Sequence, residues 1–187
     1  TPLKTREEIV AVQQTLQLII MKQQQWPAHI SNGTVMVVEK FYDTPISMIP
    51  VHPSAMEIYS YKLLHGPDFA LVTYSAKHCF DFIKGFQHLQ GLFAHEDLPA
   101  PLKKLMAEIE QVIDKPQFKI IEKCIKSEQL TKSQLLDFAH FIRYRFKHNM
   151  MSLVIMYAQI DAWYGMAKAV QKFGLVFPEF VQHDEPV

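Results

Sequence analysis

Histidine is the residue of this sequence with the widest chemical range, because an imidazole can bind a metal or move a proton near neutral pH. The nine histidines are scattered, and none has the His-x-x-x-His or Glu-x-x-His spacing that puts two metal ligands on one helix face. Around His78 and His88, the only carboxylate three or four residues away is Asp81. We therefore expect surface or loop histidines and no metal site.

Motifs for catalysis or nucleotide binding are absent from the sequence. The six glycines are isolated and form neither Gly-x-x-x-x-Gly-Lys-Ser/Thr nor Gly-x-Gly-x-x-Gly, the loops that hold phosphates with backbone N–H groups. There is no Gly-x-Ser-x-Gly elbow and no evident pairing of a cysteine with a histidine. We expect no cofactor and no catalytic residue in this chain, and an all-α enzyme ranks lowest among the interpretations.

One basic cluster contains Arg143, Arg145 and Lys147 within a predicted helix. Arg143 and Lys147 would share a face at i and i+4, whereas Arg145 and His148 would point elsewhere. The cluster is either a weak nucleic-acid contact, with cations on phosphates beside an aromatic residue, or a solvated helix face whose arginine stems cover apolar neighbours. The second interpretation is favoured.

The bulk composition fits a folded domain without a global field. The 187 residues are 49% hydrophobic, and 19 Lys plus Arg balance 19 Asp plus Glu, so net charge draws the chain to neither nucleic acid nor an anionic membrane. No apolar run approaches the ~20 residues that span a bilayer. The lone cysteines Cys79 and Cys124 favour a reduced, cytoplasmic compartment, and the start at Thr1 without Met suggests an excised domain.

Apolar residues recur mostly at helical spacing. Thr5 and Glu8 form a capping-box pattern that predicts a helix ending near Pro27. Further on, we expect short helices over 32–43 and 54–65, an irregular connector over 44–53, an ambiguous stretch over 69–74, a helix over 75–94, and helical stretches over 102–126 that break at Pro116.

The segment after the second capping box, Thr131 to Gln134, predicts the shape of the molecule. From Leu135 to Lys172 there is no proline and one glycine, which predicts a single helix. Such a helix would be about 60 Å long, roughly twice the diameter of a small domain. We therefore predict an all-α fold, an elongated helical bundle with a long C-terminal helix.

Two sequence segments resemble one family. The run from Tyr157 to Trp163, Tyr-Ala-Gln-Ile-Asp-Ala-Trp, followed by Ala167 and by Phe-Pro-Glu at 177–179, resembles the end of the core helical domain of MutS DNA mismatch-repair proteins. The opening Thr-Pro-Leu with Glu-Glu-Ile at 7–9 resembles the entry to the same domain. Val12 stands where the family usually has arginine, residues 30–100 match no motif, and the clamp insertion is missing, so the resemblance is to a divergent MutS-related type.

The resemblance implies that residues 1–187 form one core or lever domain that connects DNA-facing regions to a downstream ATPase domain. ATP and Mg²⁺ would then belong to the parent protein, which would be a homodimer that acts on DNA and not a membrane protein. Asp161 and Trp163 are the candidates for the domain junction. The alternative is a free-standing helical adaptor that binds a protein partner through an exposed aromatic face.

Overall fold

Every regular element that the structure describes is a helix. The computed structural model describes residues 5–27 and 30–180, in which there are eight α-helices, short 3₁₀ turns and no strand. Its helices are α1 (Arg6–Lys22), α2 (Asn32–Asp43), α3 (Ala55–Leu64), α4 (Gly66–Phe93), α5 (Ala100–Ile113), α6 (Lys119–Lys123), α7 (Lys132–Arg145) and α8 (Lys147–Phe173). Among these residues, no helix combines the length and the apolar surface that a membrane crossing requires.

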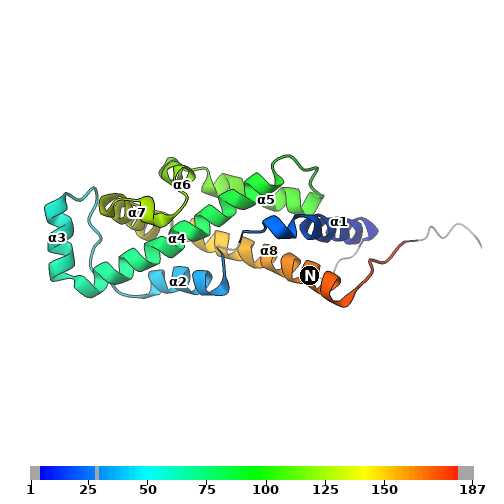
Figure 1. Ribbon diagram of the computed structural model, residues 1–187, viewed down its shortest axis with the longest axis horizontal. Coiled ribbons are helices and arrows are strands. Elements are labelled where there is room, and N and C mark those ends of the chain that lie inside the picture. Colours follow the sequence, from blue (N-terminus) through cyan, green and yellow to red (C-terminus); the bar gives the residue numbers. More distant parts are fainter. Residues whose placement is uncertain (1–4, 28–29, 181–187) are drawn as a thin grey trace, which may run out of the picture.

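The helices form an elongated bundle (Figure 1). α3 lies at one end of the long axis, and α1 lies toward the other end with the last turns of α8. α4 runs between these regions and packs on α2, α3, α5, α6 and α7, whereas α8 packs mainly on α1. The prediction of an all-α, elongated bundle with a long C-terminal helix is therefore confirmed.

α4 supplies the centre of the core. It buries one broad face, which contains Val72, Ala76, Cys79, Phe80, Phe82, Ile83, Phe86, Leu89 and Phe93. Gly85 lies where the chain before α2 crosses this helix, and a Cβ on Gly85 would collide with the side chain of Ile30. The missing side chain at position 85 thus lets Ile30 press directly onto α4.

Local sequence signals predicted most helix ends correctly. The Thr5 hydroxyl accepts from the backbone N–H of Glu8 at 3.2 Å, and Thr131 accepts from Gln134 at the same distance, so both predicted capping boxes are present. The predicted helix over 32–43 and the irregular connector over 44–53 are confirmed. The predicted break at Pro116 also occurs, between α5 and α6.

The start of α4 differs from the prediction. The helix predicted over 75–94 begins earlier, at Gly66 and Pro67, so that α4 also contains the ambiguous stretch 69–74. Proline is favourable in a first turn, because the N–H that it lacks would have no partner inside the helix. Only His65, with φ −130° and ψ 46°, separates α3 from α4.

The prediction of one unbroken helix over 135–172 is wrong. The chain leaves helical geometry at Phe146, where φ is −118° and ψ is 5°, and this joint separates α7 from α8. Phe146 is 1% exposed, and its ring lies 4.9 Å from that of Phe118 and 5.5 Å from that of Phe141. α7 and α8 do not fold back on each other, since α7 packs mainly on α4 and α8 on α1. The 27 residues of α8 still give a helix of about 40 Å.

A hydrogen bond from α2 satisfies the backbone at this joint. In an unbroken helix, the carbonyl of Ile142 would accept from the backbone N–H of Phe146. Here the buried hydroxyl of Tyr42 donates to that carbonyl at 3.0 Å. A break that would otherwise leave a buried carbonyl without a donor is thereby stabilised.

The Tyr42→Phe variant tests the role of this hydroxyl. Removing it leaves the Ile142 carbonyl without its donor, so we expect a loss of about 1–3 kcal/mol in the free energy of unfolding, measured by urea denaturation. The matched control, Tyr59→Phe, removes a hydroxyl from an exposed side chain on α3 and should change stability by no more than about 0.5 kcal/mol. Equal effects of the two substitutions would show that Tyr42 does not hold the joint.

Candidate functional site

Arg143, the first residue of the predicted basic cluster, is turned into the protein. Its Nη2 donates to the carbonyl of Thr44 at 2.8 Å, and its guanidinium lies 5.2 Å from the ring centre of Phe41. Nη1 is buried and has no acceptor among the described residues. Arg143 therefore fastens α7 to the end of α2, and most of its charge is directed away from solvent.

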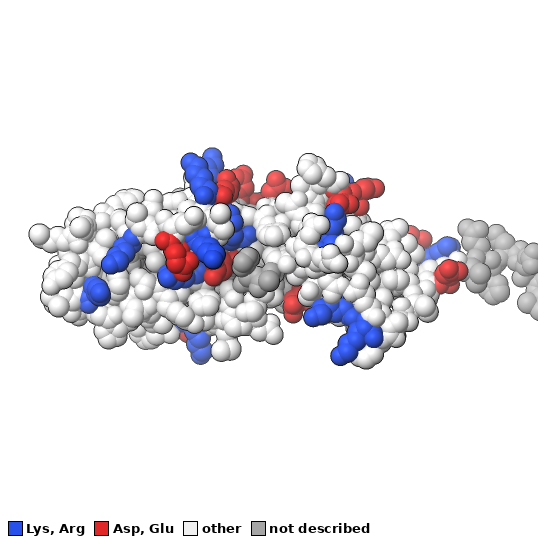
Figure 2. Space-filling model, viewed as in Figure 1, with Lys and Arg blue, Asp and Glu red and all other residues white. Residues whose placement is uncertain are grey.

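Arg145 and Lys147 remain exposed on either side of the joint. The Lys147 ammonium lies 5.6 Å from the ring centre of Tyr42. Arg145 instead lines a cleft together with His52 and His140. The three cations of the cluster thus do not form one continuous basic face. On the face shown in Figure 2, Lys and Arg side chains are interspersed with Asp and Glu, as expected for a chain of zero net charge.

Side chains of α7 hold the proline-rich connector, residues 44–53, against that helix. The bonds join Arg143 to the Thr44 carbonyl, the Ile49 N–H to the Tyr144 hydroxyl (3.5 Å), Asp137 to the backbone and imidazole of His52, and the Ser133 hydroxyl to the Pro53 carbonyl (3.0 Å). These five hydrogen bonds form a clasp that fixes the connector. His52 adopts φ 46°, a left-handed conformation that is rare for residues other than glycine. Sequence reasoning missed this clasp, although Ser133, Asp137 and Tyr144 lie at helical intervals.

The cleft beside the clasp has a volume of about 650 Å³. Its lining combines apolar side chains, such as Phe138 and Phe141, with His52, Asp137, His140 and Arg145. Burial, followed by the charge of Arg145, lowers the pKa of His140, so that its imidazole is neutral at pH 7. The residues that line the cleft include no serine, threonine, cysteine, tyrosine or lysine. Of the side-chain types that act as covalent nucleophiles, the lining contains the carboxylate of Asp137 and the imidazoles of His52 and His140, and Asp137 is already hydrogen-bonded to His52.

The two predicted junction residues differ in environment. Asp161 is exposed on α8, and Trp163 is 7% exposed within the core. Tyr164, beside Trp163, stacks on Trp26 with ring centres 4.6 Å apart and planes 9° apart. Trp26 in turn contacts the edge of Phe93, with ring centres 6.3 Å apart. This aromatic stack links α8 to the end of α4 through the segment that follows α1.

After α8 the chain turns toward α1. Gly174 ends the helix at φ 60°, a conformation that glycine adopts without strain. Residues 175–180, the return segment, then run back to α1, where Gln13 donates to the carbonyl of Pro178 at 3.1 Å and Arg6 to that of Phe180 at 3.4 Å. The Arg6 guanidinium also lies 5.5 Å from the Phe180 ring centre. Both ends of the described chain consequently lie at the same end of the bundle.

Comparisons with family models, with curated proteins and with solved structures found no match to this chain. Within residues 5–27 and 30–180, no group of three or more His, Cys, Asp and Glu side chains is placed to hold a metal ion.

Alanine substitutions in the basic cluster should affect stability differently at the inward-facing Arg143 and at the exposed Arg145. We expect Arg143→Ala to lower the free energy of unfolding by about 1.5–3 kcal/mol, because it removes a charged hydrogen bond to Thr44 and the contact with Phe41. Arg145→Ala, on the exposed side of the joint, should change it by no more than about 0.5 kcal/mol. Urea denaturation measures both values. A smaller loss for Arg143→Ala than for Arg145→Ala would contradict the structural role of Arg143.

The raised pKa of the Tyr157 hydroxyl leads us to expect that the protein loses stability at alkaline pH. Its half-buried hydroxyl donates to the Ile30 carbonyl at 3.2 Å, and burial, followed by the negative charge of Asp161, raises its pKa to about 12. The ordinary pKa is about 10, so the unfolded chain loses this proton first. The protonated Tyr157 hydroxyl therefore makes its full contribution to the free energy of unfolding below pH 10, and this contribution is lost as the pH rises from about 10 to about 12. In urea denaturation series, Tyr157→Phe should show a shallower decline over this range and an unchanged pH dependence between pH 7 and 9. If the free energy of unfolding of the two proteins declined equally above pH 10, the Tyr157 hydroxyl would not be the group responsible.

Proposed function

We propose that this chain is the helical lever domain of a divergent, MutS-related DNA-repair ATPase, which connects DNA-facing regions to a nucleotide-binding domain. The resemblance of residues 157–163 and 177–179 to the end of the MutS core domain carries this assignment. The structural observation that supports it is an elongated bundle whose two described ends are joined at one end of the long axis. Attached domains would act on that end of the bundle, and α3 would lie at the opposite end.

The packing of the helices is suited to passing on a displacement. α8 extends about 40 Å from the joint toward the return segment and packs along α1. α4 continues the bundle past the joint by packing on both α5 and α7. Packed helices shift as units, because their interdigitated side chains resist continuous deformation. A movement imposed at the α1 end would therefore reach α7 and the clasp.

In this proposal the chain itself hydrolyses no ATP. ATP and Mg²⁺ belong to the nucleotide-binding domain of the parent protein, which is a cytoplasmic homodimer. DNA contacts come from other regions of the parent protein, and only Arg145 and Lys147 of the basic cluster are exposed enough to add to them. Asp161 offers an exposed carboxylate near the proposed domain junction, while Trp163 contributes to the rigidity of α8 from within the core.

A helical adaptor is the second candidate, and the surface of α3 favours it. Met56, Tyr59 and Leu63 are 78%, 66% and 69% exposed, and their spacing puts them on one face of the helix. An amphipathic partner helix could bind such a face. The adaptor would need no ATPase domain. A reading frame that stops shortly after Val187 would favour it over the lever.

Making α8 more flexible in the full-length protein tests the lever proposal. This protein is expected to contain the ATP-binding motif Gly-x-x-x-x-Gly-Lys-Ser/Thr within about a hundred residues of Val187. Ala158 and Ala162 are exposed on α8. Ala158→Gly with Ala162→Gly should reduce the stimulation of ATP hydrolysis by DNA roughly fivefold, because glycine loosens a helix and couplings of this kind are worth about 1–3 kcal/mol. Basal hydrolysis and DNA affinity should remain.

The matched control replaces the same two alanines with serine, which costs less helix propensity than glycine. It should keep most of the stimulation by DNA. The lever proposal fails if the glycine variant couples DNA binding to hydrolysis as well as the serine variant does, or if the full-length protein lacks an ATP-binding motif.

A further inference from the structure

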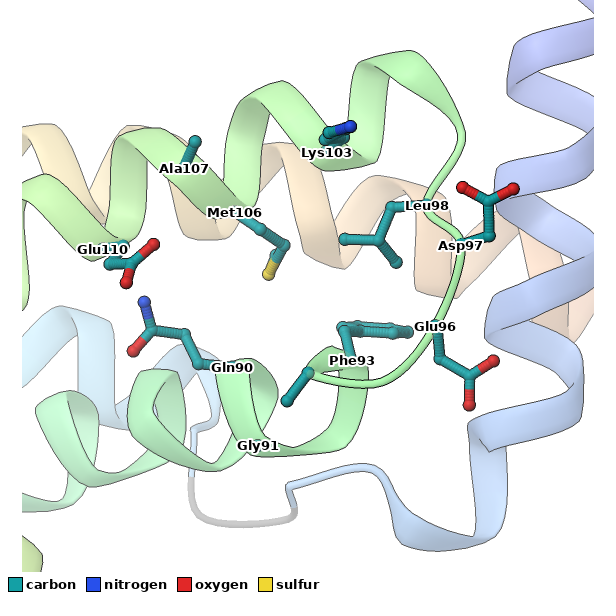
Figure 3. A pocket seen from close by; sticks show the side chains of 11 residues that line it. Gln90, Gly91, Phe93, Glu96, Asp97, Leu98, Lys103, Met106, Ala107 and Glu110 are labelled. Atoms are coloured by element: carbon teal, nitrogen blue, oxygen red, sulfur yellow. The ribbon is translucent and has the colours of Figure 1, made fainter.

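A trough opens where α4 turns into α5, near the aromatic stack (Figure 3). Its volume of about 630 Å³ lies within the range of natural ligand pockets, about 300–1,000 Å³. Phe93, Leu98 and Met106 direct their side chains toward its centre. These three residues come from the end of α4, the following loop and α5, and they give the trough an apolar floor that is continuous with the core, where Phe93 and Met106 are buried.

Carboxylates stand at both ends of this floor. In Figure 3, Glu110 lies beside Gln90 at one end, and Glu96 and Asp97 lie at the other. Lys103 is the one cation among the residues that line the trough, against three carboxylates. Glu96 is paired with Lys22 of α1. Asp97 and Glu110 are exposed and have no ion-pair partner among the described residues, so both remain available to a bound cation.

The charge of the trough selects its occupant. Asp97 and Glu110 carry two negative charges, unpaired among the described residues, against the single ammonium of Lys103, which disfavours the phosphate groups of nucleic acid. An apolar ligand without charge would leave Asp97 and Glu110 unused. A segment with apolar side chains between two basic residues satisfies both features, because the apolar groups cover the floor and each cation meets a carboxylate at one end.

We propose that this trough binds a peptide segment of a protein partner in which apolar residues are flanked on both sides by Arg or Lys. The site does not depend on the lever function, since an adaptor could use it equally. Its floor is connected to the rest of the bundle, because Phe93 contacts Trp26, which stacks on Tyr164 of α8. An occupant that shifts Phe93 would alter the surroundings of Trp26.

Titration with a short peptide tests the proposal. The probe is acetyl-Arg-Leu-Leu-Arg-amide, and isothermal titration calorimetry at low ionic strength should show saturable binding that weakens as NaCl is added. The tryptophan emission of the protein should change in parallel. Acetyl-Glu-Leu-Leu-Glu-amide should not bind, and acetyl-Arg-Ser-Ser-Arg-amide should bind more weakly than the probe, because it lacks the apolar anchor.

Substitutions locate the binding in the trough. Asp97→Asn with Glu110→Gln should weaken binding of the probe roughly fivefold, as expected for the loss of two exposed ion pairs. Both side chains are exposed, so the variant should fold normally, which circular dichroism verifies. The matched control, Glu39→Gln on the exposed surface of α2, should bind like the unaltered protein. The proposal is overturned if the probe shows no saturable binding, if the acidic peptide binds equally well, or if the double variant retains full affinity.

Discussion

α4 carries a broad apolar face along its whole length, and the other helices have to cover it. A broad apolar face needs several neighbours to bury it, whereas a narrow stripe needs only one. α2, α3, α5, α6 and α7 pack on its different sides and positions. Because α4 is 28 residues long, or about 42 Å, enclosing it produces an elongated bundle instead of a sphere. The shape that the proposed lever needs therefore follows from the burial of one helix.

The joint between α7 and α8 shows how packing overrides a local preference. The sequence around Phe146 contains neither proline nor glycine, and a continuous helix would satisfy its backbone. The fold gives up that continuity to bury the Phe146 ring beside Phe118 and Phe141. Tyr42 compensates for the lost backbone bond by donating to the Ile142 carbonyl. A change in helix direction is thus fixed by side chains from distant parts of the chain.

Polar contacts in the far half of the bundle have a related role. The connector at 44–53 contains three prolines and forms no helix, so its backbone groups need other partners. The clasp from α7 supplies several of them, and Arg143 does so while partly buried. This arrangement explains why a residue that looks like a candidate for phosphate contact is directed inward. Arg145 and Lys147, and Asp97 and Glu110 of the trough, are by contrast exposed and could meet a partner.

The sequence by itself determined the helical class, both predicted capping boxes and the break at Pro116, because each depends on periodicity or on groups within one turn. The elongated shape was also predicted, but from an unbroken helix over 135–172 that the structure does not contain. The residue types of the sequence also placed Arg143, Arg145 and Lys147 in one basic cluster, of which the structure exposes Arg145 and Lys147. Tertiary structure alone decided the break at Phe146, the burial of Arg143 and the position of the clasp. It likewise brought Asp97 and Glu110 to opposite ends of one trough. These features depend on contacts between different segments of the chain, and the energy of such contacts cannot be read from the spacing of residues within one helix.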